Sequence, residues 1–216
     1  MNERKPLVYV VDDDDAVRTA IRLLLKSVGL TVTQFASPEE FLAAYDEDQP
    51  GCLLLDVRMP QMTGLELQER LNRRGATIPV VFISGHADVP IAVEAMQHGA
   101  FDFLQKPFRD HDLLDRVKRA FERDAANRLQ LKAVERIRER LETLTARERD
   151  VLHEVASGKL NKIIAAELGV SPRTVEIHRA RVMEKMEANS VAQLVRMVLE
   201  LERHPIATAP ASGADA

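Results

Sequence analysis

The first half of the chain alternates between short apolar runs and helical patterns, and this alternation constrains the fold more than any other feature. Strands are predicted at 7–11, 31–35, 52–56, 79–83 and 101–104, and helices at about 15–28, 38–45, 63–74, 88–98 and 110–122. Five strands that alternate with five helices indicate a parallel sheet covered by helices on both faces. Short apolar strands suit such a sheet because both of their faces are buried. We therefore predict an α/β, doubly wound domain.

Acidic residues stand at the ends of two of these strands. Asp12 and Asp13 follow the first apolar run, and Asp56 ends the run LLLD. The carboxyl ends of the strands form the edge where parallel α/β sheets bind ligands. Carboxylates gathered there repel one another unless a cation lies between them, and Mg²⁺ prefers such oxygen ligands. The motif FLQKPF would bring Lys106 to the same edge, so the pattern indicates a phosphoryl-accepting site.

The second half of the chain carries no strand signal and reads as helices. One helix is predicted after Thr145 and before Gly158, a short one ends at Gly169, a third follows the N-cap Ser171, and SVAQLVRMVLELE forms the last. The two middle helices, joined by a tight turn at a glycine, have the helix-turn-helix signature. This half is therefore predicted to be a small all-α domain.

The segment between the two halves is polar and contains neither Gly nor Pro, which favours a helical connector. Its apolar residues Val134, Ile137, Leu141 and Leu144 are spaced like a short coiled-coil seam. The same seam could instead pack on the following domain, and the sequence leaves both alternatives open. The resulting boundaries are a domain at 1–122, a linker at 123–140, a second domain at 141–204 and a disordered tail at 205–216.

The charge distribution supports two domains rather than a chain that binds polyanions along its whole length. The net charge is −4, yet residues 1–115 carry −8 and residues 116–140 carry +5. Cys52 is the only cysteine, so no intramolecular disulfide can form. No run of about 18 apolar residues and no export signal is present, so we expect a cytoplasmic protein without a membrane span.

The combination of motifs in the first 122 residues resembles the receiver domains of two-component response regulators. The matching pieces are VVDDDD, LLLDVRMP with Gly64 after it, VVFISGHAD and FLQKPF. The pieces LTARERDVL and GKLNKIIAAELGVSPRTVEIHRARVMEKM resemble the LuxR-type helix-turn-helix. Together they resemble the NarL/FixJ family, with the FixJ branch especially close. The resemblance implies a flavodoxin-like, five-stranded receiver followed by a DNA-binding domain.

The resemblance also assigns roles to individual residues. It implies Asp56 as phosphoacceptor, Asp12, Asp13 and the Arg58 backbone carbonyl as further Mg²⁺ ligands, Lys106 as partner of the phosphoryl group, and Ser84 and Phe103 as switch residues. It also implies a cis Lys106–Pro107 bond. The expected partners are a sensor histidine kinase, promoter DNA, RNA polymerase and, on phosphorylation, a second copy of the chain. The protein would be a switch rather than an enzyme, catalysing only its own phosphorylation and slow dephosphorylation.

The second helix of the helix-turn-helix is expected to enter the major groove of DNA. Its predicted outward face offers Arg173, Thr174, Glu176, Ile177, Arg179, Arg181 and Lys185, while Lys162 on the preceding helix would suit a phosphate. Core positions are predicted for Ile163, Ile164, Leu168, Val170, Val175 and Val182, and a structural role for His178. The apolar stripe Val191, Leu194, Val195, Val198 and Leu201 is wide enough to predict pairing of two such domains. The neutral charge of residues 141–204 argues against strong non-specific binding.

Two other classes of function remain open from the sequence. An aspartyl-phosphate phosphohydrolase would carry a second acid after the nucleophile, but Asp56 is followed by Val57 and Arg58. That class also leaves residues 141–202 without a role. A receiver that regulates a protein partner without DNA is the third alternative, and specific promoter binding would distinguish it from a transcription regulator.

Overall fold

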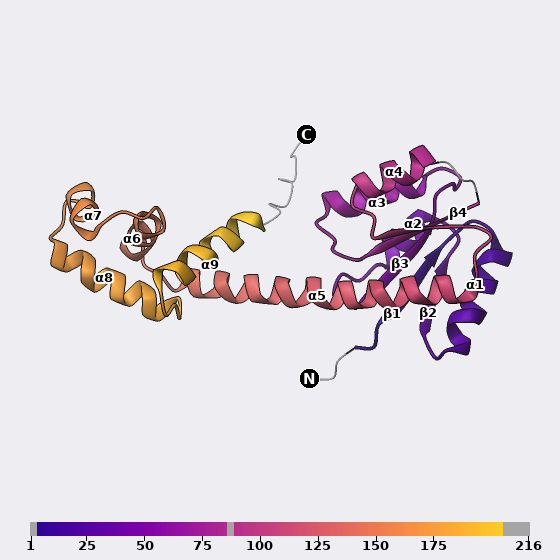
Figure 1. Ribbon diagram of the computed structural model, residues 1–216, viewed down its shortest axis with the longest axis horizontal. Helices are drawn as coiled ribbons and strands as arrows, with labels where there is room; N and C mark the ends of the chain where they lie inside the picture. The colour runs from indigo at the N-terminus through magenta and orange to yellow at the C-terminus, as the bar shows by residue number, and fades with distance from the viewer. Residues whose placement is uncertain (1–3, 86–88, 205–216) are drawn as a thin grey trace, which may run out of the picture. The chain divides into compact units, whose positions relative to one another are not determined.

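The computed structural model describes residues 4–85 and 89–204, and it divides into two compact units with the boundary between Arg128 and Leu129 (Figure 1). Each unit is described by itself. His86, the predicted helix start at residue 88 and the predicted disordered tail lie outside the described residues. Within the described residues, no helix is both long enough and apolar enough to cross a membrane.

The first unit is built on a five-stranded parallel sheet with the order β2-β1-β3-β4-β5. The strands are β1 (Leu7–Val11), β2 (Thr31–Phe35), β3 (Gly51–Asp56), β4 (Val80–Ser84) and β5 (Asp102–Gln105). The helices between and after them are α1 (Asp15–Ser27), α2 (Pro38–Ala44), α3 (Gly64–Arg73), α4 (Val89–Gln97) and α5 (Asp110–Glu142). The predicted α/β architecture is confirmed, and every predicted strand is present within one residue of its predicted bounds.

Helices cover both faces of this sheet because alternate strand residues point to opposite sides. Tyr9 and Val11 of β1 belong to one core cluster, which includes residues of α2, α3 and α4. Val8 and Val10 of the same strand belong to the other cluster, which includes residues of α1 and α5. All residues of β3 and β4 are buried, as expected for central strands of a doubly wound sheet.

Polar contacts hold α5 to the first unit beyond residue 122. The carboxylate of Asp124, 2% exposed, accepts hydrogen bonds from the Gly51 amide at 3.0 Å and the Arg128 guanidinium at 2.8 Å. Arg128 also donates to the carbonyls of Glu47 at 2.9 Å and Gln49 at 2.7 Å. The helical connector predicted from the absence of Gly and Pro is confirmed, since α5 runs without interruption to Glu142.

The second unit contains the end of α5 and four further helices. These are α6 (Ala146–Ala156), α7 (Asn161–Leu168), α8 (Pro172–Lys185) and α9 (Val191–Arg203). Leu144 lies in the core of this unit, and Ile137 and Leu141 pack against it. The seam of the connector is therefore used for packing on the following domain, which was one of the two alternatives.

Local sequence signals explain the ends of these helices. Ser171 caps α8 by accepting from the Thr174 amide, with Pro172 in the first turn, and Gly169 ends α7 in the left-handed region at φ +66°. One core assignment is wrong: Ile163 is 47% exposed, whereas the adjacent Ile164 is fully buried. Neighbouring residues of an α-helix point in directions about 100° apart, so only one of the two faces the core. The predicted stripe on α9 is partly used inside the domain, since Leu194 is buried and Val191 and Val198 pack against the same core.

Candidate functional site

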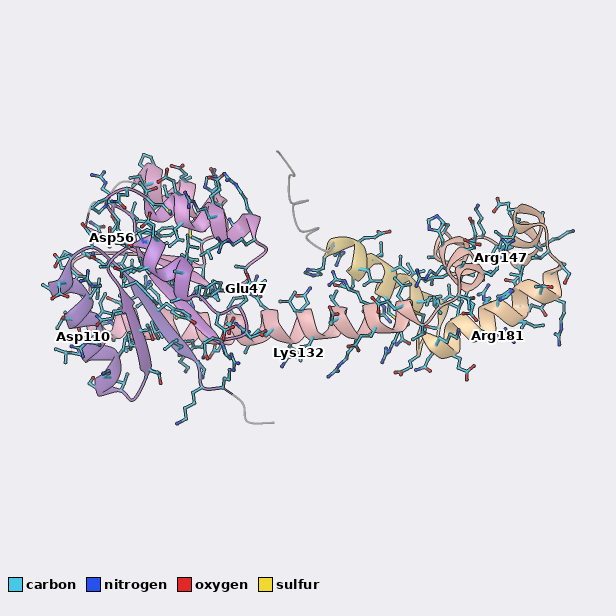
Figure 2. The ribbon with its side chains drawn as sticks, turned by 180° about the vertical axis from the view of Figure 1, so that it is seen from behind. Glu47, Asp56, Asp110, Lys132, Arg147 and Arg181 are labelled. Carbon is cyan, nitrogen blue, oxygen red and sulfur yellow. The ribbon has the colours of Figure 1, made fainter. Side chains whose placement is uncertain are left out.

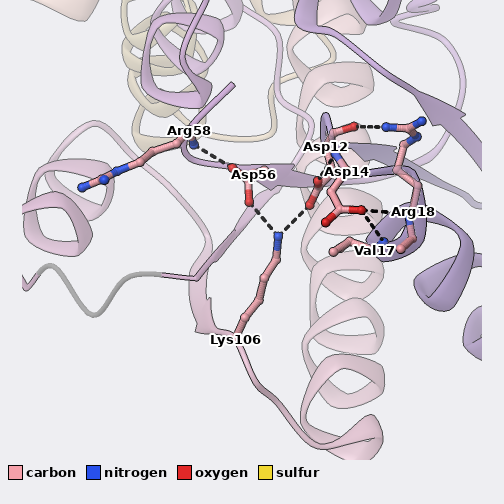
Figure 3. A network of polar contacts seen from close by, with 8 residues as sticks. Asp12, Asp14, Val17, Arg18, Asp56, Arg58 and Lys106 are labelled. Atoms are coloured by element: carbon pink, nitrogen blue, oxygen red, sulfur yellow. Dashed lines mark hydrogen bonds and ion pairs between the residues drawn. The ribbon is translucent and has the colours of Figure 1, made fainter. Parts of the chain in front are cut away.

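The sheet order places the ends of β1, β3 and β5 along one edge, and three predicted site residues meet there. The Lys106 ammonium lies 2.7 Å from Asp12 Oδ2 and 2.7 Å from Asp56 Oδ1, so it bridges the two carboxylates (Figure 3). Figure 2 shows Asp56 at this edge and Glu47 at the opposite end of the strands. Lys106 follows β5 directly, and its bond to Pro107 is cis, as the resemblance implied.

Both carboxylates are buried, and each of their oxygens accepts a hydrogen bond. Asp12 is 2% exposed and accepts a second bond from the Asp14 amide at 2.9 Å. Asp56 is 8% exposed and accepts a second bond from the Arg58 amide at 2.7 Å. Strand β1 and strand β3 therefore present two acids that are oriented by backbone amides as well as by Lys106.

Burial and pairing act in opposite directions on the charges of this site. Burial raises the pKa of Asp56, and the hydrogen bond and charge of Lys106 oppose that rise without cancelling it. For Lys106, burial alone would lower the pKa, but the hydrogen bonds and charges of Asp12 and Asp56 together raise it. The lysine is thus held as a cation between two anions.

The donor set suits a hard cation in its chemistry. Asp12, Asp56 and the Arg58 backbone carbonyl offer only oxygen atoms, which Mg²⁺ prefers. Asp13 is exposed, and in residues 4–85 and 89–204 no three His, Cys, Asp or Glu side chains lie close enough together to hold a metal ion. The structure therefore brings two of the three predicted acids together, and Asp13 stays a predicted ligand.

The two predicted switch residues lie on β4, which pairs with the strand of Asp56, and on β5, which is one strand further out. Ser84 is the last residue of β4 and is 4% exposed, and its carbonyl accepts the Lys106 amide at 2.7 Å. Phe103 on β5 is half-buried, and its ring stacks on Phe82 with a centroid distance of 6.4 Å. Both are placed where a rearrangement at Asp56 and Lys106 would reach them, and their switch roles stay predictions.

Gly64 is needed because α3 begins directly against the end of β3. A Cβ atom at this position would lie 2.2 Å from the carbonyl oxygen of Asp56 and 3.0 Å from the Phe82 ring. The glycine also donates its amide to the Val57 carbonyl at 2.9 Å. Its place after LDVRMP thus reflects close packing behind the site.

Gly64→Ala is expected to lower the free energy of unfolding by about 1–3 kcal/mol, as overpacking of a tight core does. Urea unfolding of the full chain followed by circular dichroism measures this change. Gly85→Ala is the matched control, because no atom of the described residues lies within 4 Å of a Cβ atom built there, and we expect a change below about 0.5 kcal/mol. Equal losses in the two variants would contradict the packing argument.

The predicted DNA-binding residues fall into two groups. Lys162, Arg173, Glu176, Ile177 and Arg181 are exposed. Thr174, Arg179 and Lys185 are half-buried and take part in contacts inside the domain. The half-buried His178 agrees with its predicted structural role. The exposed residues are accessible to a ligand, although Arg173 also donates to the Glu176 carboxylate at 3.3 Å, and their DNA-binding roles stay predictions.

Lys185 has a partner that the sequence analysis missed. Its ammonium lies 2.6 Å from a carboxylate oxygen of Glu148, which is 2% exposed, and 3.1 Å from the Thr143 carbonyl. The hydrogen bond from Lys185, followed by that from the Thr145 backbone, lowers the pKa of Glu148 to about 2. Thr145 followed three residues later by Glu148 is the sequence signal of a capping box and would have identified Glu148 as structural. Lys185 is therefore engaged inside the domain, and its role as a phosphate contact stays a prediction.

Arg179 is also engaged within the domain. Its guanidinium donates to the Asn161 side chain at 2.9 Å and so joins α8 to the first residue of α7. Val175 and Val182 are buried on the inner side of α8. These contacts fix which side of α8 remains outward, and that side contains Arg173, Glu176 and Ile177.

Comparison with known proteins shows to which class of protein this fold and this site belong. The receiver domain of response regulators matches residues 8–118, and the LuxR family of bacterial regulatory proteins matches residues 142–198. The chain is 50% identical to the transcriptional regulatory protein FixJ of Azorhizobium caulinodans over 89% of this chain and 91% of the relative. It is 43% identical to the response regulator protein TodT of Pseudomonas putida over 94% and 89% of the two chains.

A solved structure is similar to this chain over nearly its whole length. The response regulator StyR aligns with a TM-score of 0.72 at 42% identity and covers 91% of this chain and 99% of its own. A receiver followed by a DNA-binding helix-turn-helix is the composition of a transcriptional response regulator. The chain belongs to the two-component response regulators with a LuxR-type helix-turn-helix domain. Receivers of this family typically use Mg²⁺, and their presence implies a histidine kinase partner.

Proposed function

We propose that the protein is a transcription regulator activated by phosphorylation of Asp56. The observation that carries the proposal is the Lys106 ammonium placed 2.7 Å from both Asp12 and Asp56. A carboxylate oxygen of Asp56 attacks the phosphorus of a phosphohistidine on the sensor kinase. The phosphorus–nitrogen bond breaks, its electron pair returns to the imidazole, and an acyl phosphate is left on Asp56.

The residues around Asp56 each have a part in this transfer. The buried Lys106 supplies a fixed positive charge for the incoming phosphoryl oxygens, and the Ser84 hydroxyl is a donor for another. Asp12, Asp13, Asp56 and the Arg58 carbonyl would hold Mg²⁺, which neutralises charge on the transferring group when it is bound. The phosphoryl group adds about −1.5 to −2 charge, so Lys106 and Ser84 shift toward it and Phe103 repacks.

Phosphorylation is then expected to pair two receivers through α4 and β5. The face of α4 exposes Val89 at 70%, Val93 at 49% and Met96 at 47%, an apolar surface next to Ala92. Pairing brings two helix-turn-helix domains together, which raises the effective concentration of the second domain at DNA. The paired domains bind an inverted repeat in promoter DNA with half-sites about one helical turn apart, and contact RNA polymerase there.

The phosphoacceptor is tested by incubating the protein with Mg²⁺ and phosphoramidate and locating the added mass. We expect one phosphoryl group, on Asp56, and none in Asp56→Asn. Asp102→Asn is the control, because Asp102 lies on β5 but pairs with Arg116 and Arg119 rather than with Lys106. Label in Asp56→Asn at the wild-type rate would remove the basis of the proposal.

DNA binding is tested by footprinting on promoter fragments before and after this treatment. Phosphorylated wild-type protein should protect two symmetric half-sites, and Asp56→Asn should not respond to phosphoramidate. Sedimentation of the same samples should show dimers at tens of micromolar only after phosphorylation. Protection of a single asymmetric half-site by phosphorylated protein would contradict pairing, and absence of specific protection would favour a receiver that acts on a protein partner.

A further inference from the structure

Arg18 contacts the site without contacting Asp56 or Lys106. It lies near the start of α1, and one terminal nitrogen of its guanidinium donates to the backbone carbonyl of Asp12 at 2.6 Å (Figure 3). The other terminal nitrogen donates to the Asp15 carboxylate at 2.9 Å. The side chain is 13% exposed, so its charge is largely removed from solvent. Gln34 on β2 in turn donates to the Arg18 carbonyl.

The segment that Arg18 crosses carries four consecutive acids, residues 12–15. Like charges on neighbouring residues favour an open loop, because separation lowers their repulsion. Asp14 is fixed by its N-cap bonds to Ala16 and Val17, whereas Asp12 is the acid that reaches Lys106. Contacts from Arg18 to the Asp12 backbone and from Lys106 to its side chain hold that residue from two sides.

The two terminal nitrogens of Arg18 both donate to the acidic segment 12–15, one to the Asp12 carbonyl and one to the Asp15 carboxylate. Its guanidinium therefore acts on the phosphoryl-accepting site through Asp12 and not on the reacting atoms. Arginine suits this place because its planar fork presents two donors in a fixed geometry, which the single ammonium of lysine does not.

We propose that Arg18 is a positioning residue that fixes Asp12 for Mg²⁺. The inference rests on the proposed function, because it takes Asp12 as a ligand of the ion that accompanies phosphorylation. Without Arg18 the β1–α1 loop relaxes and the Asp12 carboxylate loses its fixed direction toward Asp56. Groups that orient the ligands of a metal typically change its affinity by about 10–100-fold when they are removed.

The test is Mg²⁺ binding to the unphosphorylated full chain by titration calorimetry, together with phosphoramidate uptake at graded Mg²⁺. Arg18→Met should raise the Mg²⁺ dissociation constant by about 10–100-fold, and the half-saturating Mg²⁺ in the uptake assay should rise in parallel. At saturating Mg²⁺ the uptake rate should return to within about twofold of wild type, since the chemical groups are intact. Arg18→Lys retains the charge and one donor, so its dissociation constant should lie between the two.

Matched variants separate the positioning role from general damage to α1. Arg22→Met removes an arginine one turn further along the same helix and should leave the dissociation constant unchanged. Asp15→Ala removes only the exposed partner and should change it by less than about threefold, as expected for a surface ion pair. If Arg18→Met does not fold, the Mg²⁺ dissociation constants of Arg18→Lys and Asp15→Ala are compared with that of the wild type instead.

The outcomes distinguish this inference from the proposed function. A wild-type dissociation constant in Arg18→Met and Arg18→Lys, with normal uptake on Asp56, overturns the role of Arg18 alone. An uptake rate that stays low at saturating Mg²⁺ overturns positioning in favour of a direct catalytic role. Failure of the wild-type protein to bind Mg²⁺ or to accept phosphate on Asp56 overturns both.

Discussion

Replacing Lys106 with methionine is expected to slow phosphoryl uptake by Asp56 by roughly 10²–10³-fold, as loss of a preorganised charge at a reacting group does. The ammonium is the cation within hydrogen-bond distance of both Asp12 and Asp56. Methionine preserves most of the side-chain volume, so the change removes charge more than packing. Uptake from phosphoramidate at saturating Mg²⁺ measures the effect, and Lys118→Met, at an exposed position on α5, should react like wild type.

The pH dependence of the Lys106→Met protein provides a second measurement. Burial already raises the pKa of Asp56, and Lys106 is the main influence that opposes the rise. Without the lysine the pKa rises further, so the nucleophilic carboxylate is lost at a higher pH and the uptake rate falls earlier on acidification. A carboxyl group with a raised folded-state pKa stabilises the fold below its ordinary pKa of 3.8, and that contribution disappears as the pH rises through the folded-state value. The variant should therefore lose stability over a wider pH range above 3.8, and an unchanged profile would contradict the pairing.

The sequence predicts the residues at the carboxyl edge of the sheet well, because the patterns that locate them are short stretches of neighbouring residues. Apolar runs locate β1 and β3, and the acid at each strand end follows from the residue order alone. Parallel strands then bring Asp12, Asp56 and Lys106 together through the right-handed crossovers that such sheets require. What the sequence does not give is the rotamer of each side chain, which explains why Asp13 was expected beside Asp12 but is exposed.

Contacts between residues far apart in the chain were the ones that sequence reasoning missed. The pairing of Glu148 with Lys185 depends on how α6 and α8 pack, and no short-range pattern encodes that distance. The same holds for Asp124, which binds the Gly51 amide from α5. The contact of Arg18 could not be predicted either, because the backbone carbonyl that it binds has no signature in the sequence. Ile163 was assigned to the core on spacing, and only the packing of α7 shows which of two adjacent isoleucines points inward.

Removing Lys185 is expected to destabilise the second unit strongly. Loss of one member of a buried ion pair leaves the other charge without a partner and costs about 3–5 kcal/mol. Glu148 is 2% exposed while the Lys185 side chain is 33% exposed, so solvent screens part of the pair. We therefore expect Lys185→Met to lower the free energy of unfolding by about 3 kcal/mol, at the lower end of that range. Lys159→Met is the control, since Lys159 pairs with two more exposed acids, Glu154 and Glu167, and we expect it to lower the free energy of unfolding much less than Lys185→Met.

The free energy of unfolding at acidic pH provides a second test of the pair formed by Glu148 and Lys185. The folded-state pKa of Glu148, about 2, lies below its ordinary value of 4.5. A depressed carboxyl pKa stabilises the fold above the ordinary value, and the contribution is lost as the pH falls from 4.5 toward 2. Lys185→Met should flatten this pH dependence because the largest cause of the low pKa is gone. Retention of the wild-type pH dependence would show that Thr145 alone holds the Glu148 carboxylate.

Salt dependence of DNA binding then decides whether Lys185 contacts phosphate. A lysine that neutralises a phosphate contributes about one unit to the slope of log affinity against log salt. Lys162 is exposed on α7, so Lys162→Ala should weaken binding to all sequences alike and reduce the slope by about that amount. The Lys185 ammonium is hydrogen-bonded to Glu148 and to the Thr143 carbonyl. Lys185→Met should therefore keep the wild-type slope when binding is measured at a temperature where the variant is folded. A slope reduced equally in both variants would mean that DNA draws Lys185 away from Glu148, and the buried pair would then be a feature of the free protein only.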